Sequence, residues 1–268
     1  MLKIFNRCFV YLLLGVMSFS IKAANIDTLA IDTKYLAGKE NVVVISPDNN
    51  SVQPSSVVYI LNGYSDNHLS WMKTQPRLPE LSDQYGVVFV MPDGRNSWYW
   101  NVPSDTLLRM EDFIVNDLVP YIDNNYNTIR LAKNRAITGN SMGGHGALWL
   151  SMRHPDVWEN AGSMSGAVDL RPYMDKWNLR ALFGDKISDF ENYTVATLVE
   201  KGGPDRLNII VDCGTDDFFF DVNQELHQSM TKHGIPHLYM TRPGGHSHPY
   251  WNTSILYHLI FFNENFKK

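Results

Sequence analysis

Cysteine, clusters of basic residues and long apolar runs are all scarce in this 268-residue sequence. Cysteine occurs only at Cys8 and Cys213, which limits the disulfides that the chain could form. The formal net charge is -5 and no run of Lys and Arg occurs, whereas nucleic-acid binding needs a concentrated basic face. We therefore expect no nucleic-acid partner. The one long apolar stretch covers residues 8–21.

The first 23 residues have the composition of a secretory signal peptide. Lys3 and Arg7 precede the apolar stretch, and Ala23 and Ala24 follow it as small residues suited to cleavage. The stretch is short for a membrane span, which needs about 20 apolar residues. We therefore predict a protein exported to the periplasm or secreted, with no stable membrane insertion after cleavage. Cleavage would also remove the first cysteine, so stability would depend on the core instead of a disulfide.

Short strands and helices alternate along most of the mature chain. Runs rich in β-branched residues predict strands at 42–45, 56–61, 87–91 and 207–212, and we predict further strands at 135–139, 162–165 and 238–241. Other segments predict helices at 79–85, 107–122, 143–153, 221–233 and 250–262. This alternation indicates an α/β fold, in which a mostly parallel sheet carries helices on both faces, as a single domain over 24–268. The segment 169–204 interrupts the alternation, and we expect it to be an insertion over one edge of the sheet.

The pentapeptide Gly139-Asn140-Ser141-Met142-Gly143 is the strongest catalytic motif in the chain. It follows a predicted strand and opens a predicted helix, which is the context that a G-x-S-x-G elbow requires. A serine on so sharp a turn needs small residues two positions before and after it, because larger ones would collide with the backbone. The turn also places Ser141 at a helix N-terminus, where N–H groups stabilise negative charge. We therefore expect Ser141 to be a nucleophile.

A nucleophilic serine in this fold needs an acid and then a histidine further along the chain. Four aspartates follow the strand predicted at 207–212. Asp212 ends the strand itself, and Asp221 is expected to cap the next helix. Asp216 and Asp217 lie in the loop between, and the pattern alone leaves both open as the acid.

Two histidines, His246 and His248, lie in the loop before the last predicted helix. His246 directly follows Gly244 and Gly245, which allow the backbone to approach the elbow closely, and His248 is its competitor. A metal site would need a third ligand at a fitting spacing, and none is apparent. We therefore expect no metal and no organic cofactor.

The tetrahedral intermediate of acyl transfer needs two N–H donors for its oxyanion. The backbone N–H of Met142 follows the nucleophile, and that of Tyr64 lies in the Asn62-Gly63 loop after an early strand. Aromatic side chains flank the predicted site loops and could either bind a sugar or phenolic ring or fill the core. As substrate-binding residues we consider Trp98, Trp100 and Trp251, with Tyr99 beside them.

The elbow and its surroundings resemble the esterase D family of α/β-hydrolases. The segment from Asn140 to Ala147 matches that family's S-M-G-G-x-G-A motif, and the similarity extends from about residue 42 to the C-terminus. The family includes feruloyl, acetyl xylan and tributyrin esterases, S-formylglutathione hydrolases and mycolyltransferases of the antigen 85 type. Its G-x-x-D-x-F element matches at Asp217, and its P-G-G-H element matches at His246. The resemblance therefore implies that these two residues complete a catalytic triad with Ser141.

The resemblance implies a serine esterase that forms an acyl-enzyme, and the expected export and the aromatic residues favour acyl groups of carbohydrate or phenolic esters as substrates. An acyltransferase of the mycolyltransferase type or a thioesterase like the S-formylglutathione hydrolases would use the same triad. A non-catalytic binding protein on this fold is a further alternative. The sequence carries no signal for the oligomeric state.

Overall fold

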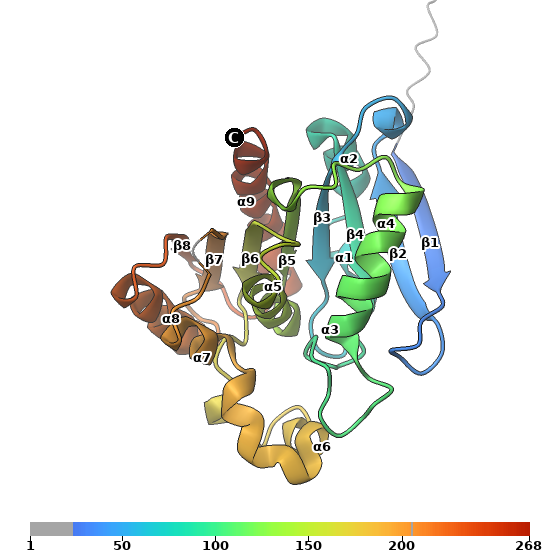
Figure 1. Cartoon of the computed structure of the whole chain (residues 1–268). Helices are drawn as coiled ribbons and strands as arrows, with labels where there is room; N and C mark the ends of the chain where they lie inside the picture. Colours follow the sequence, from blue (N-terminus) through green and yellow to red (C-terminus); the bar gives the residue numbers. More distant parts are fainter. Residues whose placement is uncertain (1–23, 205) are drawn as a thin grey trace, which may run out of the picture.

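The computed structural model describes residues 24–204 and 206–268 and contains one eight-stranded sheet (Figure 1). The strand order is β1-β2-β4-β3-β5-β6-β7-β8, and the six strands from β4 to β8 in this order run parallel. β2 pairs antiparallel with β4, and β1 pairs antiparallel with β2. The strands are β1 (Asn25–Ile31), β2 (Glu40–Ser46), β3 (Ser56–Leu61), β4 (Val87–Pro92), β5 (Arg135–Gly139), β6 (Asn160–Met164), β7 (Asn208–Gly214) and β8 (His237–Arg242).

Helices cover both faces of this sheet, as the alternating pattern predicted. Successive strand residues point to opposite faces, so Val57 and Tyr59 of β3 lie in one apolar cluster and Val58 and Ile60 in the other. The first cluster is covered by α3 (Met110–Phe113), α4 (Val119–Asn125), α5 (Met142–Arg153), α7 (Val195–Glu200) and α8 (Phe220–Lys232). The second is covered by α1 (Ser70–Thr74), α2 (Leu78–Tyr85) and α9 (His248–Phe266).

The structure differs from the prediction at one strand and one helix. β1 was not predicted, because it is an edge strand whose residues are mostly exposed and carry no apolar alternation. The helix predicted at 107–122 begins instead at Met110 and contains a π-helical turn at Ile114–Leu118. Pro120 follows this turn, and because proline lacks an N–H and crowds the preceding turn, a widened turn accommodates it.

Residues 179–193 of the segment 169–204 lie beyond the carboxyl ends of the strands, so the prediction of an insertion over a sheet edge was wrong (Figure 1). Its helix α6 (Leu179–Phe183) and the 3-10 segment Gly184–Tyr193 pack on the loop after β4, where the Phe183 and Trp100 rings lie 5.4 Å apart. α7 then packs on α5 and α8. Ring contacts between the insertion and the loop after β4 stabilise this placement, among them that of Trp177 with Trp98.

The predicted signal peptide, at 1–23, lies outside the described residues, so export stays a prediction. Within the described ranges, no helix combines the length and the apolarity needed to cross a membrane. Cys213 lies in β7 with a free, buried thiol.

Candidate active site

Ser141 occupies a sharp turn between β5 and α5. Its φ of 56° and ψ of -117° are strained for a residue with a side chain, and such strain is typical of functional positions. A methyl group built on Gly143 would lie 2.3 Å from the Leu61 carbonyl oxygen, and one on Gly139 would lie 2.5 Å from the same atom. Both glycines are therefore required for the elbow to approach β3.

Ser141, His246 and Asp217 form a chain of hydrogen bonds across three loops. His246 Nε2 lies 2.9 Å from Ser141 Oγ, and His246 Nδ1 lies 2.9 Å and 3.0 Å from the two carboxylate oxygens of Asp217. The Asp217 side chain is fully buried, and its Oδ1 also accepts the backbone N–H of Phe219 at 2.9 Å. Because the carboxylate can only accept, Nδ1 carries the proton in the neutral ring and Nε2 is free to accept one from Ser141.

The neighbouring candidates Asp216 and His248 lie outside this chain. Asp216 is exposed, and its backbone N–H donates to the Gly244 carbonyl at 2.9 Å, which holds the aspartate and histidine loops together. His248 Nδ1 lies 2.7 Å from Thr74 Oγ1. His248 is also the first residue of α9, two positions earlier than the predicted start, because Pro249 in the first helical turn needs no N–H partner.

The other two aspartates near the β7 loop, Asp212 and Asp221, do not contact His246 either. Asp221 lies inside the first turn of α8 and does not cap it, since the helix begins one residue earlier. Asp212 is fully buried, with Oδ2 3.2 Å from Arg242 Nη2 and Oδ1 without a hydrogen-bond partner. Burial raises the pKa of Asp212 to about 6, against the opposing effects of Ser254 and Arg242.

The loop after β3 brings its backbone against the nucleophile. A methyl group built on Gly63 would lie 3.6 Å from Ser141 Cβ and 2.8 Å from Asn140 Nδ2, so a larger residue there would displace the Asn140 side chain. Tyr64 follows directly. Met142 is the first residue of α5, so its N–H is one of those that a helix leaves without an intrahelical acceptor. Both predicted oxyanion donors therefore belong to segments that adjoin Ser141.

Asn62 and Tyr99 connect this loop to the loop after β4. Asn62 Oδ1 accepts the Gly94 N–H at 2.9 Å, and the Tyr99 hydroxyl donates to Asn62 at 3.1 Å. Tyr99 is fully buried, and burial raises its pKa well above the ordinary tyrosine value, so it remains a donor. Sequence reasoning missed this role of Asn62, because the partner comes from a loop that lies more than thirty residues away.

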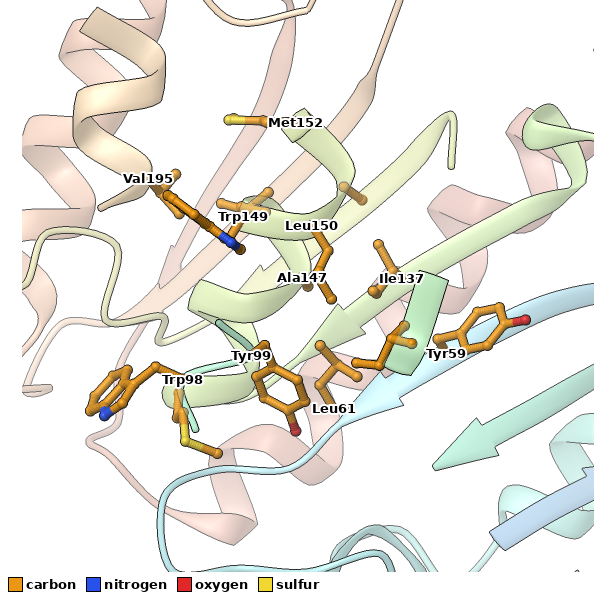
Figure 2. Packing of buried hydrophobic residues seen from close by; sticks show 14 of the residues in the cluster. Tyr59, Leu61, Trp98, Tyr99, Ile137, Ala147, Trp149, Leu150, Met152 and Val195 are labelled. Carbon is orange, nitrogen blue, oxygen red and sulfur yellow. The ribbon is translucent and has the colours of Figure 1, made fainter. Parts of the chain in front are cut away.

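Trp98, Trp100 and Trp251 are buried, and the first two expose no face that a substrate could stack on. Trp98 is 1% exposed and Trp100 0% exposed, and Trp98 lies with Tyr99 in the apolar cluster around α5 (Figure 2). The prediction that these two tryptophans bind substrate was therefore wrong, and core packing is their role. Trp251 is 5% exposed and packs edge-on against the His246 ring at 4.8 Å.

Phe218 and Trp177 form an exposed aromatic rim beside His246, which was not predicted from the sequence. The Phe218 ring is 55% exposed and lies 4.3 Å from the His246 ring. Trp177, which is partly buried, stacks on Phe218 at 6.3 Å. Phe218 is part of the element that identified Asp217, but the pattern does not indicate which aromatic residue faces solvent.

Among the described residues, no group of three or more His, Cys, Asp or Glu side chains could hold a metal ion. The arrangement suits nucleophilic chemistry by a serine whose base and acid are already aligned.

The sequence matches a known protein family. Residues 33–262 match the model of the family described as "Putative esterase". The chain belongs to this family. The esterase is 27% identical to an acetyl esterase of Caldicellulosiruptor saccharolyticus over 215 residues, which cover 74% of this chain and 79% of the relative. This match confirms the resemblance inferred from the elbow.

Two solved structures are similar to the esterase over most of their length. The Staphylococcus aureus fluorophosphonate-binding serine hydrolase FphF has a TM-score of 0.81 and 19% identity, with 90% of this chain and 99% of that chain covered. A ferulic acid esterase has a TM-score of 0.79 and 25% identity, with the same coverage. The α/β-hydrolase fold is thereby confirmed, and the chain is an enzyme of the carboxylic ester hydrolase class.

Proposed function

We propose that the esterase hydrolyses carboxylic esters through an acyl-enzyme on Ser141. His246 Nε2 accepts the Ser141 proton while Oγ attacks the ester carbon, and the alcohol leaves with that proton. Water then attacks the acyl-enzyme and gives its proton to His246, which returns it to Oγ as the acid departs. Asp217 orients the ring and stabilises its positive charge.

The backbone N–H groups of Met142 and Tyr64 would hold the oxyanion of both tetrahedral intermediates. The Met142 donor lies at the positive end of the α5 dipole, which favours negative charge. The bonds from Asn62 to the loop after β4 would keep the Tyr64 segment in place before substrate arrives. Donors that need no rearrangement stabilise a developing charge most effectively.

The observation that carries this proposal is the unbroken series of hydrogen bonds from Ser141 Oγ through His246 to the buried Asp217 carboxylate. Each bond is near 2.9 Å, the usual length for a hydrogen bond of this kind. Such an alignment of nucleophile, base and orienting acid meets the geometric requirement for covalent catalysis.

For the substrate we propose acyl groups on carbohydrate or phenolic esters, such as acetyl and feruloyl esters. The exposed Phe218 and the adjoining Trp177 offer an apolar surface beside His246 that suits a phenolic ring. Relatives named as an acetyl esterase and a ferulic acid esterase support the same substrate range. Export, proposed from the segment 1–23, would bring the enzyme to extracellular polymers.

A fluorophosphonate probe and three variants test the mechanism. We expect the wild type to be labelled on Ser141 and to cleave phenyl acetate, and Ser141→Ala to lose both properties. His246→Ala should lose nearly all turnover, whereas His248→Ala should retain it. Circular dichroism would show whether the variants are folded. A folded Ser141→Ala that still turns over, or an inactive His248→Ala beside an active His246→Ala, would contradict the proposal.

A further inference from the structure

A polar pocket lies beside the loop whose Gly63 approaches the proposed nucleophile. It has a volume of about 370 Å³, and its lining comes from the segment after the β3 loop, from α1 and from the start of α9. Every lining side chain is polar: three hydroxyls, an amide, the Lys73 ammonium, the Asp66 carboxylate and the His248 imidazole. Its size falls in the range of about 300–1,000 Å³ that is usual for ligand sites.

Two contacts connect this pocket to the catalytic residues. The methyl position on Gly63 that lies 3.6 Å from Ser141 Cβ also lies 3.6 Å from Asp66 Oδ2, so one glycine separates the carboxylate from the nucleophile. The Trp251 ring packs against His246 at 4.8 Å and against His248 at 5.1 Å. The pocket therefore adjoins two residues, Gly63 and Trp251, that also contact the catalytic residues.

The hydrogen bonds around His248 leave its Nε2 as an acceptor near a second acceptor, Asp66 Oδ2. The Thr74 hydroxyl donates its one proton to the Ser70 carbonyl at 3.0 Å, so the 2.7 Å bond to His248 must be donated by Nδ1–H. In the neutral ring, His248 Nε2 is then an acceptor, and it lies 4.0 Å from Asp66 Oδ2, another acceptor. That distance is too long for a direct hydrogen bond, and because both side chains are accessible, hydroxyl groups of a ligand could donate to both atoms.

We infer that this pocket binds the alcohol half of the ester and selects a polyol, with two neighbouring hydroxyls donating to Asp66 and His248. Hydroxyls both donate and accept, so a polyol can satisfy the ammonium, amide, carboxylate and imidazole together. An apolar alcohol would remove water from these groups and return no hydrogen bond. The acyl half is less polar and matches the Phe218 rim. This inference rests on the proposed esterase function.

Two acetyl esters that differ only in the alcohol test the inference: a pentose monoacetate and phenyl acetate. We expect Asp66→Ala and His248→Ala to lower kcat/KM for the sugar ester about tenfold relative to phenyl acetate. Asp156→Ala and His233→Ala remove the same side chains at exposed positions, and these controls should leave the ratio unchanged. Equal losses on both esters in the pocket variants would overturn the inference.

A binding measurement separates failure of the pocket from failure of the proposed reaction. Methyl xyloside, which has no ester, should inhibit phenyl acetate hydrolysis competitively in the wild type and about tenfold more weakly in the pocket variants. It should also bind the Ser141→Ala protein, as titration by calorimetry would detect. Failure of methyl xyloside to bind either protein would overturn the polyol site even if the esterase reaction holds. If wild type cleaves neither ester, binding of the xyloside to Ser141→Ala still decides the inference.

Discussion

The loop after β4 and the loop after β7 are both rich in aromatic residues and both reach the elbow, yet they orient their side chains in opposite ways. In the first, Trp98, Tyr99 and Trp100 are consecutive and all buried. In the second, Phe218 is exposed while Phe219 is buried. One loop contributes all its aromatic rings to the core, and the other exposes one ring beside His246.

The backbone explains how the first loop buries three large residues in succession. Four of its residues have a positive φ: 48° at Arg95, 55° at Asn96, 57° at Trp98 and 63° at Tyr99. Such conformations cost of order 1–3 kcal/mol each, and the surrounding packing must offset that cost. Aromatic residues next to an active site are therefore no indication of substrate binding until their exposure is known.

The largest expected effect separates two adjacent aspartates of the β7 loop. Asp217→Asn should leave the fold intact and lower kcat by up to about 10⁴-fold, because an amide no longer fixes the correct tautomer of His246. Asp216→Asn changes an exposed side chain and should alter kcat by less than about threefold. Steady-state kinetics on phenyl acetate would measure both, and the reverse ranking would exclude Asp217 as the orienting acid.

The second expected effect compares an aromatic residue from each loop by its contribution to stability. Trp100→Ala removes a fully buried ring and should lower the free energy of unfolding by about 3–5 kcal/mol. Phe218→Ala removes a ring that is 55% exposed and should cost less than about 1 kcal/mol. Guanidinium denaturation curves would compare the two. Similar losses would mean that the β7 loop is as much a part of the core as the β4 loop.

The third expected effect concerns the buried carboxylate that precedes the β7 loop. Burial raises the pKa of Asp212 to about 6, so the folded state holds its proton more tightly than the unfolded chain does. Its stabilising contribution is full below about pH 4 and is lost as the pH rises through 6, a change of about 3 kcal/mol. In Asp212→Asn, the free energy of unfolding should no longer show this decrease between about pH 4 and pH 6. Asp156→Asn, at an exposed position, is the control, and parallel curves for wild type and Asp212→Asn would refute the expectation.

The smallest expected effect tests whether the exposed rim selects the acyl group. Phe218→Ala should lower kcat/KM for methyl ferulate about tenfold more than for an acetyl ester, because only the phenolic ring can stack on Phe218. The comparison variant is Leu131→Ala, which removes an exposed apolar side chain elsewhere. Equal effects of Phe218→Ala on both esters would show that the rim does not distinguish acyl groups.

Most of the sheet could be predicted from the sequence because its strands are buried on both faces. β3 and β5 were predicted at their observed boundaries, and the apolar run of β3 is typical of a strand whose two faces both lie under helices. β1 lies at the edge with mostly exposed residues and therefore has no comparable pattern. The insertion itself was predicted, but its position was not, because that position depends on ring contacts with loops distant in sequence, such as that of Trp177 with Trp98.

The sequence by itself determined the elbow and the two loops that face it. Only glycine at positions 139 and 143 allows the elbow to lie against the Leu61 carbonyl of β3. The two glycines of the motif therefore predict the elbow directly. The local pattern could not choose between Asp216 and Asp217 or between His246 and His248, and the choice required a family resemblance.

Only the tertiary structure decided which side chains face one another and which face solvent. It brought Asp217, and not Asp216, within hydrogen-bond distance of His246. It also buried Trp98 and Trp100 and exposed Phe218, although all three are aromatic residues in loops. Burial and pairing depend on segments far apart in the chain, and a local pattern carries no information about the direction from which those segments arrive.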